Sequence, residues 1–174
     1  MVKKFFKTIV FYLASKIVDY SNQYRREKVY RKYNFDPTIV FDQVSFEGNI
    51  KIGSYTYINE RSRIDSGPNS SIEIGQHCAI GRNVHITSKK HDLRQPTSSS
   101  KHPEINHIEN DVKIGDYVWI GDNVLILPGV KIEDYAVIGA NSVVNSNVKK
   151  FEIVGGVPIK HLRFNKEHND FPEE

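Results

Sequence analysis

The sequence predicts an all-β solenoid, a parallel β-helix, preceded by one helix. Aliphatic or aromatic residues recur every six positions, a small residue follows many of them, and a second apolar position lies two residues earlier. A helix would need apolar spacings of three and four, and ordinary strands would need longer alternation. Short apolar-polar-apolar pieces broken by a turn every six residues predict strands of two or three residues in stacked coils. An ordinary β-sandwich is the alternative, with turns about every eight to twelve residues.

The six-residue repeat runs in three registers. Its first shift, by four residues, falls at 67–70, and a longer interruption spans residues 87–107. We expect the repeated side chains to point inward and to stack about 4.8 Å apart, one coil on the next. The glycine, Asn or Asp that often follows is expected to relieve a corner with positive φ. The predicted inward positions are Val40, Phe46, Ile52, Ile58, Ile64, Ile74, Ile80, Ile86, Ile108, Ile114, Ile120, Ile126, Ile132, Ile138 and Val144.

Charge is concentrated at the N-terminus. The 174 residues carry a net charge of +3, but residues 1–33 hold nine Lys/Arg against two acidic residues, so the rest of the chain is mildly acidic. A nucleic-acid binder usually carries its basic patch on the folded body, so a nucleic-acid partner is disfavoured. No apolar stretch is long enough to span a membrane. The single cysteine, Cys78, excludes an intrachain disulfide, and its inward position predicts a small core residue rather than a nucleophile.

The basic segment, residues 1–36, predicts an amphipathic helix over 3–33. Apolar residues form a stripe along one face and are spaced by four, four, four and three positions. Asn34 and Pro37 are expected to end the helix. One interpretation is a helix that caps the solenoid or packs on a neighbouring subunit. The other is a peripheral membrane contact through residues 1–33, with aromatic residues at the interface and lysines on anionic lipid. The stripe consists of Phe5, Ile9, Leu13, Ile17 and Tyr20.

The interruption at 87–107 predicts a polar loop extruded from one corner of the solenoid. It contains two prolines and three consecutive serines, and loops of this length are usually functional or disordered. Within it, His91 is the candidate for acid–base chemistry, because an imidazole exchanges a proton near neutral pH. A solvent-exposed histidine without a role is the alternative.

Five segments in order carry a resemblance to a known family: Lys90-His91-Asp92, IGDYVWIG at 114–121, LPGV at 127–130, VIGANSVV at 137–144 and GGVPIK at 155–160. Together they resemble the hexapeptide-repeat acetyltransferases, in the branch of the galactoside/maltose, xenobiotic and colanic-acid-type polysaccharide O-acetyltransferases. The resemblance implies a left-handed coil over residues 37–157, a homotrimer, and a short helix or tail at 158–174. It also implies acetyl-CoA as co-substrate, no metal, and a cytoplasmic location. The basic N-terminal segment adds a peripheral contact to the inner face of the membrane as a further option.

The resemblance also implies roles for individual residues. His91 would be the general base that deprotonates a substrate hydroxyl as it attacks the thioester of acetyl-CoA. Trp119 would lie near that histidine, although an exposed indole can also serve interface packing. Acetyl-CoA would lie along the coil corners at Gly121, Asp122, Ala140 and Asn145, and its phosphates at Lys160 and Arg163, which could equally be solvated. Asn59 and Asp92 would contact the acceptor, although corner asparagines often serve turn geometry alone.

The predicted activity is O-acetylation of a sugar or glycan precursor. N-acetylation of an amino sugar and acetylation of a xenobiotic remain alternatives, because the same base serves both acceptors. A metal enzyme like the γ-class carbonic anhydrases is a further alternative, since His102 and His107 are five residues apart. A non-catalytic solenoid used for assembly is the last.

Overall fold

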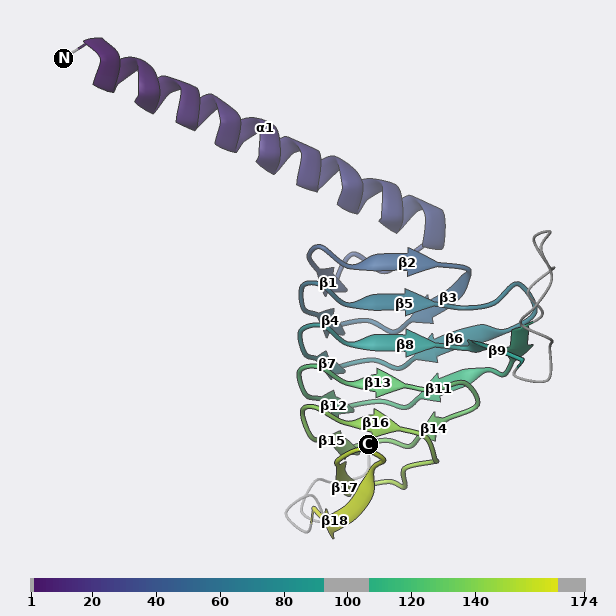
Figure 1. Ribbon diagram of the computed structural model, residues 1–174. Coiled ribbons are helices and arrows are strands. Elements are labelled where there is room, and N and C mark those ends of the chain that lie inside the picture. Colours follow the sequence, from purple (N-terminus) through teal and green to yellow (C-terminus); the bar gives the residue numbers. More distant parts are fainter. Residues whose placement is uncertain (1, 93–106, 166–174) are drawn as a thin grey trace, which may run out of the picture. The chain divides into compact units, whose positions relative to one another are not determined.

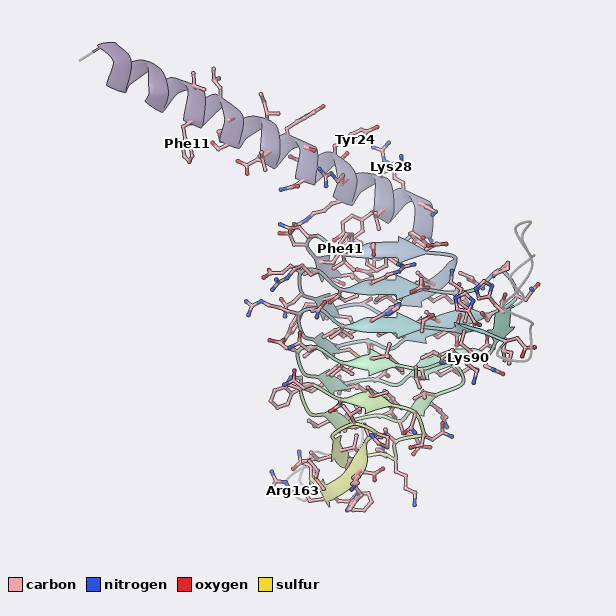
Figure 2. All side chains as sticks on the ribbon, in the orientation of Figure 1. Phe11, Tyr24, Lys28, Phe41, Lys90 and Arg163 are labelled. Carbon is pink, nitrogen blue, oxygen red and sulfur yellow. The ribbon has the colours of Figure 1, made fainter. Side chains whose placement is uncertain are left out.

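The N-terminal unit is a single helix. The computed structural model describes residues 2–92 and 107–165, with side chains from residue 10 onward, and it divides into the compact units Met1–Asn34 and Phe35–Glu174. Helix α1 (Val2–Tyr33) confirms the predicted helix, and Asn34 ends it with a φ of 50°, a left-handed conformation that asparagine tolerates. Phe11, Tyr24 and Lys28 project from it (Figure 2). Within the described residues, no helix is long and apolar enough to cross a bilayer.

The second unit is a parallel β-helix with three sheets as its walls (Figure 1). The chain passes from sheet A to sheet B to sheet C and returns to sheet A one coil further on. Sheet A contains β1 (Val40–Phe41), β4 (Tyr57–Ile58), β7 (Ala79–Ile80), β12 (Trp119–Ile120), β15 (Val137–Ile138), β17 (Glu152–Gly155) and β18 (Lys160–Phe164). Sheet B contains β2 (Ser45–Glu47), β5 (Arg63–Asp65), β8 (His85–Thr87), β13 (Leu125–Ile126) and β16 (Val143–Val144). Sheet C contains β3 (Asn49–Ile52), β6 (Ser71–Ile74), β11 (Val112–Ile114) and β14 (Lys131–Ile132).

The strand register confirms the six-residue repeat. In sheet A, Ile80 pairs with Ile120 and Ile120 pairs with Ile138, and each of the three is at most 1% exposed. In sheet B, Ile86 pairs with Ile126 across the same interruption. The residues between β8 and β11 therefore leave the stack without breaking it, because the coils on either side pair directly. Stacked isoleucines fill the centre, and burying each contributes about 1.5–3 kcal/mol.

Two predicted inward positions are wrong. Val40 is 58% exposed, and its neighbour Phe41, which is 4% exposed, pairs with Ile58 instead. The first coil stacks on one other coil only, and here bulky rings replace the isoleucine stack: Phe41 and Phe46 meet edge to face at 5.0 Å. Ile108 is also displaced, since it lies half-buried on a hairpin outside the coil, opposite Lys90.

The expected role of the corner glycines is also wrong. Positive φ values occur two residues later, at Tyr55, His77, Tyr117 and equivalent positions, and not at the glycine itself. The glycines serve close approach: a Cβ at Gly121 would lie 2.7 Å from the backbone nitrogen of Ala140. Successive coils are too close at this corner for a side chain.

The interruption and the C-terminus contain strands that the sequence analysis does not predict. Residues 89–91, expected as loop, form β9 (Lys89–His91), which pairs antiparallel with β10 (His107–Glu109). Residues 160–164, expected as a helix or tail, form β18, which pairs antiparallel with β17. An edge strand of a sheet leaves backbone groups unpaired, and β18 covers this edge of sheet A.

Candidate active site

A groove crosses sheet A and brings five predicted site residues together. It has a volume of about 400 Å³ and runs over β4, β7, β12 and β15. The five residues that line it are Asn59, Trp119, Gly121, Asp122 and Ala140. Four further residues that line it are not predicted as site residues: Tyr57, Ala79, Gly81 and Gly139. Ala79, Gly81 and Gly139 lie one coil away from Trp119 or Gly121, and Tyr57 lies one coil beyond Ala79, so stacking the repeats in register would have found them.

Trp119 and Asn59 point out of the solenoid because their neighbours point in. Trp119 is 60% exposed and lies between Ala79 and Val137 on the adjacent strands. Asn59 follows the buried Ile58, and its backbone N–H donates to the carbonyl of Ile80 at 3.0 Å. Trp119 and Asn59 thus line the same groove.

Backbone donors are available where the groove meets the next corner. At other corners, the backbone N–H of the residue after the glycine donates to an aspartate one coil further on. The N–H of Arg82 donates to Asp122 Oδ1 at 2.8 Å, and that of Asp116 donates to Asp134 Oδ1 at 3.0 Å. The equivalent partner of the Asp122 N–H is Ala140, which has no carboxylate. Within the described part of the chain, the Asp122 N–H has no acceptor. An extended amide such as pantetheine needs donors of this kind.

The predicted cations lie further along the same sheet. Lys160 pairs with Gly155 and Arg163 with Ile153, which places both on β18, two strands beyond β15. Both side chains are exposed (Figure 2 labels Arg163). Neither residue lines the groove; both lie on the last strand of sheet A, the sheet that the groove crosses. Asn145 is exposed after β16, outside the groove, so the structure does not bring it to the other predicted residues.

His91 lies on the hairpin, beside a second histidine. The register pairs His91 with His107, and their ring centroids are 4.9 Å apart. The imidazole of His91 is exposed, and Asp92 follows it at the end of β9. The sequence also offers His107 as a metal ligand together with His102, and His102 lies outside the described residues. An exposed imidazole on a paired strand can exchange a proton with a bound hydroxyl.

The groove and His91 lie on opposite sides of one chain. The hairpin leaves the coil between β8 of sheet B and β11 of sheet C, and this corner of the triangle is opposite sheet A (Figure 1). A single chain therefore carries His91, the predicted base, on one side and the groove on the other. A second copy would have to bring its hairpin to this groove for the two to meet.

Cys78 has the predicted structural role. It is 1% exposed, and its thiol donates to the carbonyl of Gly115 at 3.1 Å. Burial raises the pKa of the Cys78 thiol to about 11. Since the thiolate is the nucleophilic form, this cysteine is chemically inert near neutral pH.

Comparisons with known proteins identify a family. The family model "Bacterial transferase hexapeptide (six repeats)" matches residues 111–146. WbbJ of Escherichia coli (strain K12), named for an O-acetyl transfer in lipopolysaccharide biosynthesis, is 32% identical over 125 residues, 69% of this chain and 60% of that protein. A chloramphenicol acetyltransferase of Morganella morganii is 30% identical over 141 residues, 66% of this chain and 67% of that protein.

A solved structure has the same fold. A hexapeptide-repeat acetyltransferase from Vibrio cholerae in complex with acetyl-CoA matches with a TM-score of 0.63 and 28% identity, over 82% of this chain and 78% of that one. The fold and groove thus define a hexapeptide-repeat β-helix. This chain belongs to the hexapeptide-repeat acetyltransferase family. It spans 60% of the length of WbbJ.

Proposed function

We propose that the protein is an acetyl-CoA-dependent O-acetyltransferase that acts on a hydroxyl of a sugar or glycan precursor. The observation that carries the proposal is the groove of sheet A, with an exposed indole and an open backbone N–H at Asp122. The acetyl-CoA bound to the Vibrio cholerae relative supports the cofactor, and the name of WbbJ supports the acceptor class. The same base would also serve an amine acceptor or a xenobiotic.

In this mechanism His91 removes the proton from the acceptor hydroxyl while the oxygen attacks the thioester carbonyl. The bond from the carbonyl carbon to sulfur then breaks, and the proton passes from the imidazole to the leaving thiolate of CoA. A backbone N–H at the groove stabilises the intermediate oxyanion, an interaction worth about 3–4 kcal/mol in other acyl-transfer enzymes. The mechanism uses no metal. Lys160 and Arg163 supply positive charge for the phosphates of CoA.

The site is complete only in an oligomer. Because His91 and the groove lie on opposite sides of one chain, we assign the base at each groove to a neighbouring copy, in a homotrimer of left-handed coils. Three copies around a threefold axis give each groove one hairpin, and a closed ring leaves no site unpaired. Because acetyl-CoA is a cytoplasmic metabolite, we propose that the reaction takes place in the cytoplasm.

The experiment that tests the function is replacement of His91 by alanine. Wild-type protein is incubated with acetyl-CoA, a thiol reagent, and a panel of nucleotide sugars and oligosaccharides, and release of CoA is followed. The His91→Ala variant should lose acceptor-dependent release by about 10²–10⁴-fold. His77→Ala, which removes another exposed histidine that does not line the groove, is the control. Full activity of His91→Ala would contradict the assignment and would move the base to His85, His102 or His107.

We also infer a peripheral contact of α1 with an anionic membrane surface. Five apolar side chains on one face of the helix are between 49% and 73% exposed: Val10, Leu13, Ile17, Tyr20 and Tyr24. The nine cations of residues 1–33 complement anionic headgroups. Side-by-side packing of the same helix from other copies would instead gather like charges. A glycan precursor carried on a lipid would be presented at such a surface.

A further inference from the structure

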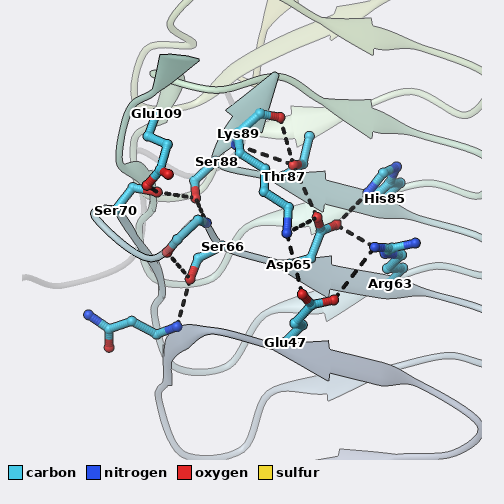
Figure 3. A network of polar contacts seen from close by, with 12 residues as sticks. Glu47, Arg63, Asp65, Ser66, Ser70, His85, Thr87, Ser88, Lys89 and Glu109 are labelled. Atoms are coloured by element: carbon cyan, nitrogen blue, oxygen red, sulfur yellow. Dashed lines mark hydrogen bonds and ion pairs between the residues drawn. The ribbon is translucent and has the colours of Figure 1, made fainter. Parts of the chain in front are cut away.

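We propose that the four-residue shift of the repeat, at residues 67–70, holds the hairpin that carries His91, and that Glu109 positions this base. The hairpin consists of β9 and β10, and the seat is defined as Asp65 together with residues 67–70. The proposal rests on the proposed function of His91. It explains why the repeat is irregular one coil before the hairpin leaves the solenoid. Figure 3 shows the contacts.

Glu109 anchors β10 to the seat. Its Oε2 accepts the backbone N–H of Asn69 at 2.7 Å and the hydroxyl of Ser70 at 3.2 Å. Both donors belong to the four residues that interrupt the repeat, and they are 40 and 39 positions away in the sequence. A regular coil would continue directly from β5 to β6 and would offer neither donor. The additional residues thus create a site for one carboxylate.

A glycine and a buried serine shape the same seat. A Cβ at Gly67 would overlap the carboxylate of Glu109, so only glycine lets Glu109 approach. The Gly67 N–H donates to Ser88 Oγ at 3.1 Å, and Ser70 and Ser88 share a hydrogen bond of 2.7 Å between their hydroxyls. Ser88 is fully buried and directly precedes β9. The seat therefore holds the start of β9 as well as β10.

Lys89 anchors β9 through two carboxylates. Its Nζ lies 3.6 Å from Oδ2 of the buried Asp65 and 3.5 Å from Oε1 of Glu47. Arg63 and His85 also contact Asp65, at 3.2 Å and 2.6 Å (Figure 3). Asp65 is thus surrounded by cationic or hydrogen-bonding groups, and a buried carboxylate with such partners is costly to displace.

The two anchors form one rung of the hairpin. Lys89 pairs with Glu109, and two residues further along the strands His91 pairs with His107. The rung nearest the solenoid is therefore fixed on both strands, and the rung that carries the base extends from it. A misplacement of about 1 Å can reduce a rate about a hundredfold. Glu109 touches no reacting atom in this mechanism and acts through the position of His91.

The test combines hydrogen exchange with kinetics on the full-length protein. In Glu109→Ala, we expect amides of residues 88–92 and 107–110 to exchange at least about tenfold faster, while those of β7 and β12 keep the wild-type rate. We expect kcat to fall by about tenfold or more with the KM for acetyl-CoA within about twofold, because the groove is unchanged. Glu109→Gln retains an acceptor oxygen and should restore both values.

The matched control is Glu73→Ala, which removes a carboxylate of sheet C paired with Lys51 at 3.2 Å and not with the hairpin. It should leave exchange and kcat at wild-type values. Unchanged hairpin exchange in Glu109→Ala would overturn the seat, and faster exchange with unchanged kcat would overturn the positioning role. If wild-type protein transfers no acetyl group, the proposed function fails, and the exchange rates still decide whether the seat exists.

Discussion

Replacement of Ala140 by aspartate should separate stability from cofactor binding. Three corners of the solenoid place a glycine against an aspartate of the next coil, and Gly121 meets Ala140 at the equivalent position. In Ala140→Asp, the new carboxylate can accept the Asp122 N–H as Asp122 accepts that of Arg82, at 2.8 Å. The substitution therefore gives this corner the same hydrogen bond between coils that the other corners have. In the variant, the Asp122 N–H, which we assign to acetyl-CoA, is no longer free to bind the cofactor.

The two effects have opposite signs. A hydrogen bond of this kind contributes about 0.5–1.5 kcal/mol to stability, so the variant should be as stable as the wild type or about 1 kcal/mol more stable. Loss of the same hydrogen bond to the cofactor weakens binding by about 0.5–1.5 kcal/mol, which corresponds to a dissociation constant about two- to twelvefold higher. The carboxylate has no cation to pair with in the groove and adds nothing favourable to binding.

Titration calorimetry with CoA measures the affinity, and urea unfolding measures the stability. Asp134→Ala is the control, because it removes the acceptor of Asp116 at a corner outside the groove. That variant should lose about 1 kcal/mol of stability and keep its affinity for CoA. Unchanged affinity in a folded Ala140→Asp protein would refute the assignment of the Asp122 N–H to the cofactor.

Two further predictions concern the core and the N-terminal helix. Burial raises the pKa of Cys78 to about 11 from an ordinary value near 9, so the unfolded chain loses this proton first and stability should fall from about pH 9 to pH 11. Urea unfolding across this range checks the fall, and Cys78→Ala should remove that part of it. The protein should sediment with vesicles containing phosphatidylserine, less so at high salt, and not with phosphatidylcholine alone. Ile17→Asp should weaken this binding more than the control Ser15→Asp, which makes the same charge change outside the apolar stripe. Equal losses of binding in the two variants would exclude the proposed contact, and so would equal binding of the wild type to neutral vesicles.

The periodicity of the sequence determined the coil. Inward isoleucines such as Ile120 and Ile138 are set by a local rule, since each six-residue step turns one corner and every coil repeats the same geometry. The same rule placed Trp119 outward, between two inward neighbours. It failed at Val40, because the end coil stacks on one side only and accommodates rings instead.

Tertiary structure decided the arrangement of the site. Stacking of coils brought Asn59 into one groove with Ala140, 81 positions away, and left the Asp122 N–H open, because the missing carboxylate belongs to a different coil. It also brought Glu109 to the irregular residues 67–70, a contact across 40 positions between two segments that break the repeat. Periodicity describes how each coil resembles the next. Contacts between unlike residues of different coils have no period, so only the folded chain reveals them.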